Sequence, residues 1–374
     1  MTVQGKTVSA IDIARGALGL LPDMPRILPS LFNLAFLRPH SRRSLGLLFQ
    51  ETAAKHARQP FLKSGGETWS YEKANACCNQ MARGLQALGV QAGDTVGLLS
   101  VNRAETLLAV IACAKLGAVA ALLNTNQQGA VQAHSIGLVK PRLVLACDKG
   151  MDILKTLDKE QPGFLKPIEV LSLQAASSDL LVSDFRSAWC TQPAHNLACT
   201  AQIIASSPCF YIFTSGTTGL PKASVMSHYR WLQAALGMNT AVRLNSDDVL
   251  YCCLPLYHNN ALTVSLGVVV AAGACFALDE KFSASKFWHR IAHYKSTVFC
   301  YIGELLRYLL NQPKRMDDQN HEVRLILGNG LRPEIWGDFE NRFGIHQIFE
   351  FYGASESNLG FMNAFGLKET VGFC

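Results

Sequence analysis

The sequence predicts a large α/β protein with two adjoining, doubly wound sheets. Short, continuously apolar segments alternate with helical segments along most of the 374 residues. Continuously apolar strands are typical of parallel sheets that helices cover on both faces. Hydrophobic residues make up 49% of the chain and charged residues 17%, whereas about 25% charged residues is usual. This balance favours a large buried core and excludes a disordered protein.

Residues 1–45 form a basic, apolar segment that differs from the rest of the chain. Ser9 is placed to cap a helix, with Asp12 at its third position. Because proline interrupts helices, we expect the segment to be broken into short pieces at Pro22, Pro25, Pro29 and Pro39. Its apolar side chains need a surface to cover, which is either the main domain or the headgroups of a membrane. Both interpretations stay open.

From residue 46 onward, helices and strands alternate. Ser70 is placed to cap a helix that Gly89 closes, and a second helix is expected near Glu105–Leu116. Apolar strands are expected in the first half at Thr95–Ser100, Ala118–Leu123, Arg142–Cys147 and Ile168–Leu173. Strands are expected in the second half at Cys209–Phe213, Asp248–Cys253, Ala274–Leu278, Thr297–Tyr301, Arg324–Leu327 and Gln347–Phe351. Helices are expected there at Ser283–His293, Gly303–Leu310 and Pro333–Phe343.

One stretch, Ala261–Leu278, has 18 residues without a charge, the length at which a membrane span must be considered. Gly273 stands where a helix would end, and the residues after it fit a short buried strand. We therefore expect a core helix followed by a strand.

Several protein classes are disfavoured by charge and cysteine usage. The net charge of +6 is spread along the chain without a basic run, which argues against nucleic-acid binding. The 12 cysteines include no C-x-x-C pair, so reduced, buried thiols in a cytoplasmic protein are expected. His289 and His293 lack the intervening glutamate of a zinc protease helix. The expected location is the cytoplasm, with peripheral contact at the inner face of a membrane as the open addition.

The strongest chemical signal is the segment Tyr211–Lys222, which follows an apolar strand. Glycines let a backbone approach an anion closely, while hydroxyls and a lysine bind phosphate oxygens. The residues expected to do so are Thr214, Ser215, Gly216, Thr217, Thr218, Gly219 and Lys222. The spacing is not that of a Walker A loop. The plainer alternative is a polar turn between two strands.

This segment resembles the phosphate loop of the adenylate-forming superfamily of acyl-CoA synthetases, adenylation domains and luciferases. The resemblance implies that the loop holds the β- and γ-phosphates of ATP while a carboxylate attacks the α-phosphate. A second segment, Phe351–Ser357, is similar to the family's Y-G-x-T-E motif. The resemblance implies that Tyr352 stacks on adenine beside Gly353, that Ser355 contacts the α-phosphate, and that Glu356 binds Mg²⁺. Ser355 stands where the family usually has threonine, and Ser357 where close relatives have glycine.

Two further segments fit the order of the family's motifs. Leu254–His258 resembles the segment whose histidine lies beside the acyl carboxylate, which implies a role for His258, although an ordinary loop histidine is the alternative. Gly330 follows a strand where the family's backbone lies against the adenine or the acyl chain, although a plain strand-to-helix turn also explains it. The resemblance thus gives Lys222, Thr217, Glu356 and His258 the catalytic roles.

A finer resemblance, to the fatty acid transport protein and very-long-chain acyl-CoA synthetase branch, lies in Lys281–Trp288, Tyr301–Leu310 and Phe349–Gly353. It implies that a fatty acid and ATP form acyl-AMP and pyrophosphate, and that CoA then takes the acyl group. Residues 46–374 are expected to form the large AMP-binding domain, incomplete at its C-terminus. The family's ribose-binding aspartate, hinge and small lysine-bearing domain cannot be assigned. The alternatives are an impaired nucleotide- or fatty-acid-binding fragment, or an acyl-AMP ligase with a different acceptor.

Overall fold

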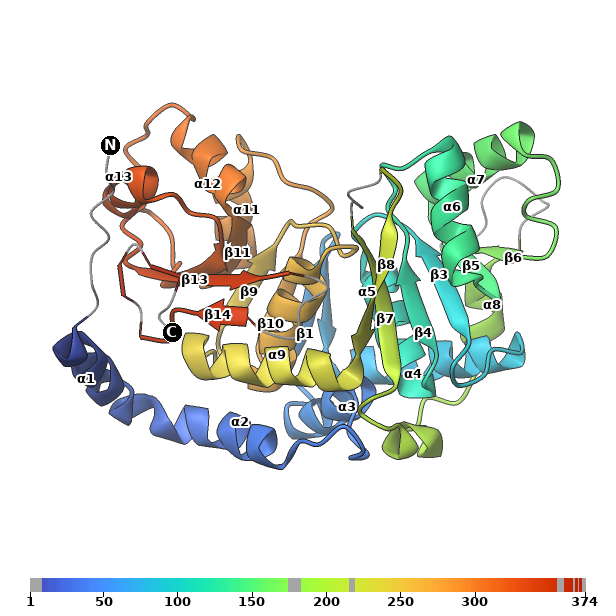
Figure 1. Cartoon of the computed structure of the whole chain (residues 1–374), viewed down its shortest axis with the longest axis horizontal. Coiled ribbons are helices and arrows are strands. Elements are labelled where there is room, and N and C mark those ends of the chain that lie inside the picture. The colour runs from blue at the N-terminus through green and yellow to red at the C-terminus, as the bar shows by residue number, and fades with distance from the viewer. Residues whose placement is uncertain are drawn as a thin grey trace.

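The computed structural model describes residues 9–173, 183–214, 219–354, 360–365, 367–368 and 370–371. Within these residues two sheets stand side by side with helices between and around them (Figure 1). The six-stranded sheet has the order β6 (Glu169–Ser172), β5 (Leu143–Ala146), β3 (Thr95–Leu99), β4 (Val119–Leu122), β7 (Pro208–Thr214) and β8 (Lys222–Ser227). The eight-stranded sheet has the order β14 (Gly360–Met362), β13 (Gln347–Gly353), β12 (Leu325–Asn329), β11 (Val298–Ile302), β9 (Val249–Cys252), β10 (Cys275–Leu278), β1 (Pro60–Ser64) and β2 (Glu67–Ser70). The predicted fold class is confirmed.

Most neighbouring strands run parallel, and the antiparallel pairs stand at sheet edges. Strand β8 pairs antiparallel with β7, β14 with β13, and β2 with β1. In each pair, two strands that follow one another in the sequence form a hairpin. The parallel interior confirms the expectation drawn from the continuously apolar strands, because β3, β4, β5 and β10 are almost wholly buried.

The main core lies between the two sheets. It contains α3 (Leu45–Lys55), α4 (Tyr71–Ala87), α5 (Ala104–Leu116), α9 (His228–Val242) and α10 (Leu266–Ala272). The outer face of the six-stranded sheet is covered by α6 (Gly129–Val139) and α7 (Asp148–Glu160). On the far side of the eight-stranded sheet lie α11 (Phe287–Tyr294), α12 (Gly303–Leu310) and α13 (Pro333–Phe343) (Figure 1). The short helix α8 (Phe185–Trp189) packs on α4, and a 3-10 turn, Ala198–Gln202, packs on α3 and α5.

The uncharged stretch Ala261–Leu278 contains helix followed by strand, as predicted. A π-helical turn, Asn260–Ser265, leads into α10, which ends at Gly273 with φ 73°, and β10 follows at once. A left-handed residue is the usual end of a helix, and glycine adopts it without strain. In the described part of the chain, no helix combines the length and the apolar character that a membrane span requires.

The N-terminal segment corrects one expectation. Helix α1 (Ala10–Gly19) begins directly after Ser9, and a 3-10 turn, Leu21–Asp23, separates it from α2 (Met24–Phe36). Pro29 does not break the segment, because it lies inside α2. Packing of α2 on α9 buries Ile27 and Ser30, which offsets the hydrogen bond that proline cannot donate.

The predicted helix Ser283–His293 is also corrected. Residues 283–286 form a turn that the Lys286 N–H closes by donating to the Ser283 carbonyl at 3.2 Å, and α11 starts only at Phe287. Two serines near the start favour such local turns over a helix.

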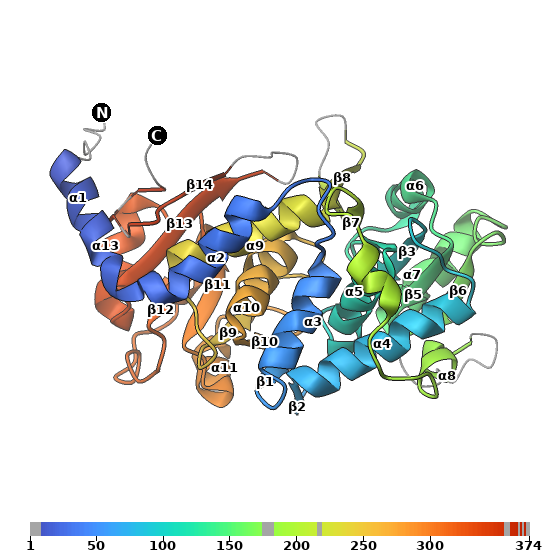
Figure 2. The same cartoon turned by 90° about the horizontal axis from the view of Figure 1, so that it is seen from below.

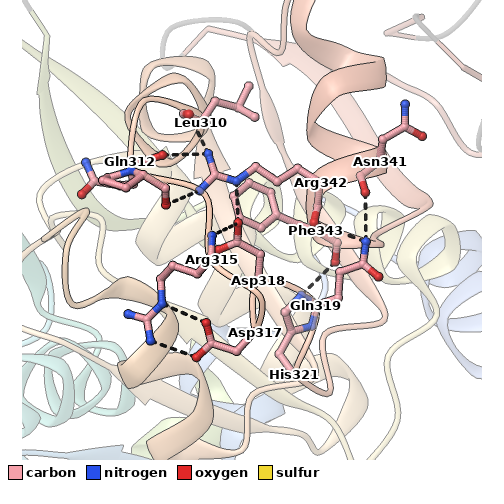
Figure 3. Close-up of polar contacts among 11 residues, drawn as sticks. Leu310, Gln312, Arg315, Asp317, Asp318, Gln319, His321, Asn341, Arg342 and Phe343 are labelled. Atoms are coloured by element: carbon pink, nitrogen blue, oxygen red, sulfur yellow. Dashed lines mark hydrogen bonds and ion pairs between the residues drawn. The ribbon is translucent and has the colours of Figure 1, made fainter.

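Arg342, together with Gln319 and His321, holds the long connection between α12 and β12 against α13 (Figure 3). Arg342 of α13 donates to the carbonyls of Leu310 and Gln312 at 2.7 and 2.9 Å, and to the Asp318 carboxylate at 2.7 Å. The side chains of Arg342 and Asp318 are each 8% exposed. The connection is therefore held to α13, next to the strands β12 and β13 that lead to the site.

Candidate functional site

A cavity of about 830 Å³ opens where the two sheets meet. Its lining comes from strands β12 and β13, from the segment after β9, and from β8 and α9. Ligands of open α/β sheets bind beyond the carboxyl ends of the strands, which is where β12 and β13 reach this cavity. Its volume falls within the usual range for small-molecule sites.

The lining of the cavity is mixed in chemistry. Its polar members include Asn329 and His258, and Arg230 and Gln233 of α9. Its apolar members include Met226, Ala234, Met238, Val264 and Met362. The cavity can therefore hold a ligand that has both polar and apolar parts.

Tyr352 and Gly353 lie at the end of β13, and both line the cavity as an adenine site would require. The Tyr352 side chain is 64% exposed, so its ring face is open to a flat ligand. Ser355 and Glu356, the proposed α-phosphate and Mg²⁺ contacts, lie outside the described residues.

His258 also lines the cavity, in the turn before the π-helical segment. Its ring meets the Tyr257 ring edge-on, with centroids 4.8 Å apart. Although the residue has exposed surface, neighbouring atoms shield its ring from water and lower the pKa of His258 below its usual value. The neutral imidazole that results can still donate a hydrogen bond to a carboxylate. The Tyr257 hydroxyl in turn accepts from the Asn126 amide at 3.0 Å, which links this turn to the segment after β4.

The ends of the proposed phosphate segment are fixed by strand pairing. Thr214 ends β7, Lys222 begins β8, and the two residues are direct partners across the hairpin. Gly219 has φ 91°, a conformation that suits glycine. The His134 ring of α6 contacts the Pro221 carbonyl at 3.0 Å, and the carbonyl can only accept. Ser215, Gly216, Thr217 and Thr218 lie outside the described residues.

Gly330 has a positive φ of 86° and stands behind Asn329, which is the member of this turn that lines the cavity. The Asn329 side-chain carbonyl accepts from the Asn260 amide at 2.8 Å. The turn therefore faces the site with a fixed side chain.

Sequence reasoning missed the group that holds this turn, the carboxylate of Glu350. Only 2% of Glu350 is exposed, and its carboxylate accepts from the N–H groups of Gly330 at 3.0 Å and Leu331 at 2.9 Å and from the Tyr301 hydroxyl at 2.5 Å. Burial raises the pKa of Glu350, and these hydrogen bonds oppose the increase. One signal was available, because a glutamate in the middle of an apolar strand needs buried partners.

Sequence reasoning also missed helix α9. This helix lines the cavity with Arg230, Gln233, Ala234 and Met238. The signal was present at its start, where the Ser227 hydroxyl accepts from the Arg230 N–H at 3.2 Å. A serine cap followed by apolar residues at three- and four-residue steps is the usual pattern of a helix start.

Comparisons with known proteins agree with this arrangement. The family described as AMP-binding enzyme matches residues 49–373. A Medium/long-chain-fatty-acid--CoA ligase, FadD6, of Mycobacterium tuberculosis is 43% identical over 367 residues, covering 98% of this chain and 60% of that protein. Long-chain fatty acid transport protein 2 of Rattus norvegicus is 37% identical over 86% of this chain and 52% of its own length.

Among solved structures, the inhibitor-bound N-terminal domain of FACL13 from Mycobacterium tuberculosis has a TM-score of 0.76 at 21% identity. The match covers 86% of this chain and 78% of that one, and it shows a shared fold. The chain spans 52 to 60% of the length of the two curated relatives described here. Because the family match covers most of the sequence, the chain belongs to the AMP-binding enzyme family.

Proposed function

We propose that this chain is the ATP- and acyl-binding part of a long-chain or very-long-chain fatty acid CoA ligase. One observation carries the proposal. A single cavity is lined by Tyr352 and Gly353 of the nucleotide motif together with apolar side chains such as Met226, Met238 and Val264. The relatives named above as fatty-acid CoA ligase and fatty acid transport protein support the substrate class.

The proposed reaction has two steps. The fatty acid carboxylate attacks the α-phosphate of ATP and forms acyl-AMP with loss of pyrophosphate. The CoA thiol then attacks the acyl carbon, forms the thioester and releases AMP. No covalent bond to the protein is required, so the protein acts by positioning and by stabilising charge.

Each residue then has a role that matches its chemistry. Lys222, exposed at the start of β8, offers a positive charge to the phosphate oxygens beside the hydroxyls of Thr214 and Thr217. Tyr352 stacks on adenine, and His258 donates to the acyl carboxylate. Mg²⁺ would neutralise charge that develops on the phosphates. Glu356 is its proposed ligand, with the oxygen chemistry that this ion prefers.

Pyrophosphate release with a series of acids tests this proposal. We expect release to require ATP, Mg²⁺ and a fatty acid, and to favour C16–C18 acids because each buried methylene contributes about 0.8 kcal/mol. Much faster turnover of medium-chain or aromatic acids would contradict the substrate class. Pyrophosphate release without a CoA thioester would instead favour an acyl-AMP ligase with another acceptor. Binding of ATP or fatty acid without pyrophosphate release would favour the impaired binding fragment.

A further inference from the structure

The N-terminal helices carry an apolar surface that no described element covers. Among the residues whose exposure the structure describes, seven of the 16 exposed large hydrophobic side chains lie between Ile11 and Phe36. We define the apolar ridge as Ile11, Leu18, Leu21, Leu28, Phe32 and Phe36, whose exposed fractions run from 53 to 66%. Scattered apolar residues are normal on a surface, but a contiguous group marks a site of contact.

Helix α2 is apolar on two opposite sides. One side packs along α9, where Ile27 is 4% exposed and the Ser30 hydroxyl accepts from the Asn239 amide at 3.5 Å (Figure 2). The opposite side bears Phe32 and Phe36, with ring centroids 4.6 Å apart. Packing on the main domain therefore accounts for one side of the helix only.

The charges beside the ridge are mostly positive. Residues 1–45 contain Lys6, Arg15, Arg26, Arg38, Arg42 and Arg43 but only two acids, Asp12 and Asp23. The Asp23 carboxylate pairs with Arg243 at 3.0 Å and with Arg26 at 3.3 Å. Arg43 pairs with the Glu51 carboxylate at 2.7 Å. The side chains of Arg15, between Ile11 and Leu18, and of Arg38 and Arg42, after Phe36, are exposed. A basic rim around an apolar strip is complementary to an anionic lipid surface.

We propose that the apolar ridge docks on a membrane that contains anionic phospholipids, with α1 and α2 lying flat in the headgroup region. A second copy of this chain fits less well. Ridge-to-ridge contact would bring the arginines of both copies together, and like charges across an interface oppose association.

Docking would also place the cavity close to the lipid. Helix α9 contacts α2 through Asn239, and Arg243 just after it pairs with Asp23 of the turn before α2, while Gln233, Ala234 and Met238 of α9 line the cavity. Helices α2 and α9 thus lie between the ridge and the cavity, and a helix with its side chains is about 10–12 Å across. This consequence rests on the proposed function, because a fatty acid partitions into the bilayer that the ridge would contact.

Vesicle co-sedimentation tests the docking directly. The protein is mixed with vesicles of phosphatidylcholine alone and of phosphatidylcholine with phosphatidylserine. We expect binding to the anionic vesicles, weakened by salt, and a decrease of about tenfold or more in the Phe32→Glu/Phe36→Glu double variant. The matched control is Leu138→Glu/Met316→Glu, which changes two exposed apolar residues on other surfaces and should bind as the original protein does.

Circular dichroism and ATP binding of each variant keep the outcomes distinct. Equal vesicle binding by the ridge variant and the original protein overturns the proposal. So does self-association that the ridge variant abolishes, without any vesicle binding, because it assigns the ridge to a second copy. Vesicle binding that depends on the ridge in a protein that binds no ATP supports the docking while contradicting the proposed function.

Discussion

Replacing Glu350 with alanine tests how the cavity wall is held. The substitution leaves the N–H groups of Gly330 and Leu331 and the Tyr301 hydroxyl without their acceptor. An unsatisfied buried donor costs about 1–3 kcal/mol. Three such donors give roughly 3–9 kcal/mol, and water can reach the partly exposed Gly330, so we expect a loss of about 3–5 kcal/mol in the free energy of unfolding.

Two further variants separate the contributions. Tyr301→Phe removes only the hydroxyl and should cost about 1 kcal/mol. Glu350→Gln keeps the shape and one acceptor oxygen but turns an NH₂ donor toward one of the three donors, so its loss should fall between the other two. Urea unfolding measures all three variants.

The same variants should weaken ATP binding, since Asn329 of the held turn lines the cavity. The comparison is the Kd for ATP against the free energy of unfolding across the series. A Glu350→Ala protein that loses less than about 1 kcal/mol and binds ATP normally would refute the positioning argument. A stability loss without any change in ATP binding would limit Glu350 to a structural role.

Three further predictions follow from single residues. Burial lowers the pKa of His228 to about 4, below its unfolded value near 6.5. The stability that the neutral histidine contributes is therefore present above pH 6.5 and is lost as the pH falls through the folded pKa. This lowering of the pKa corresponds to about 3 kcal/mol. The His228 ring accepts from the Leu45 N–H at 3.2 Å, and His228→Asn, which can still accept that hydrogen bond, should flatten the pH dependence in urea unfolding from pH 7 to 4.5. Lys222→Ala should raise the Kd for Mg·ATP at least about tenfold with an unchanged melting temperature, because Lys222 is exposed; a large drop in melting temperature would point to a structural role. His134→Ala should weaken ATP binding a few-fold by freeing the Pro221 carbonyl, and equal binding by His134→Gln would show that the hydrogen bond and not the ring matters.

The sequence predicted the interior of both sheets well because buried parallel strands are apolar throughout. Residues 275–278 illustrate this, since β10 follows a left-handed glycine and is buried along its whole length. Edge strands lack that signal. Strand β8 has exposed Lys222 and Val225, and its sequence does not distinguish a strand from a loop.

The predicted site could be placed only in part. Tyr352, Gly353 and His258 line one cavity. No single-sequence pattern could reveal that Glu350 contacts residues 330 and 331, because that contact depends on the pairing of β12 with β13. Sequence patterns report local periodicity, whereas buried hydrogen-bond partners depend on which strands become neighbours.

Each of the two motif segments joins a pair of antiparallel strands, which the predicted alternation of helix and strand did not suggest. Thr214 pairs with Lys222 across one antiparallel hairpin, and Gly353 pairs with Gly360 across another. The plainer interpretation of the first segment, a polar turn between two strands, agrees with the pairing of Thr214 with Lys222. It does not exclude phosphate binding. A hairpin fixes both ends of the connection at one distance, which lowers the entropy that a ligand must remove on binding. Because Thr214 and Lys222 are paired in one hairpin and Gly353 and Gly360 in the other, the antiparallel edge pair of each sheet anchors a motif segment at both of its ends.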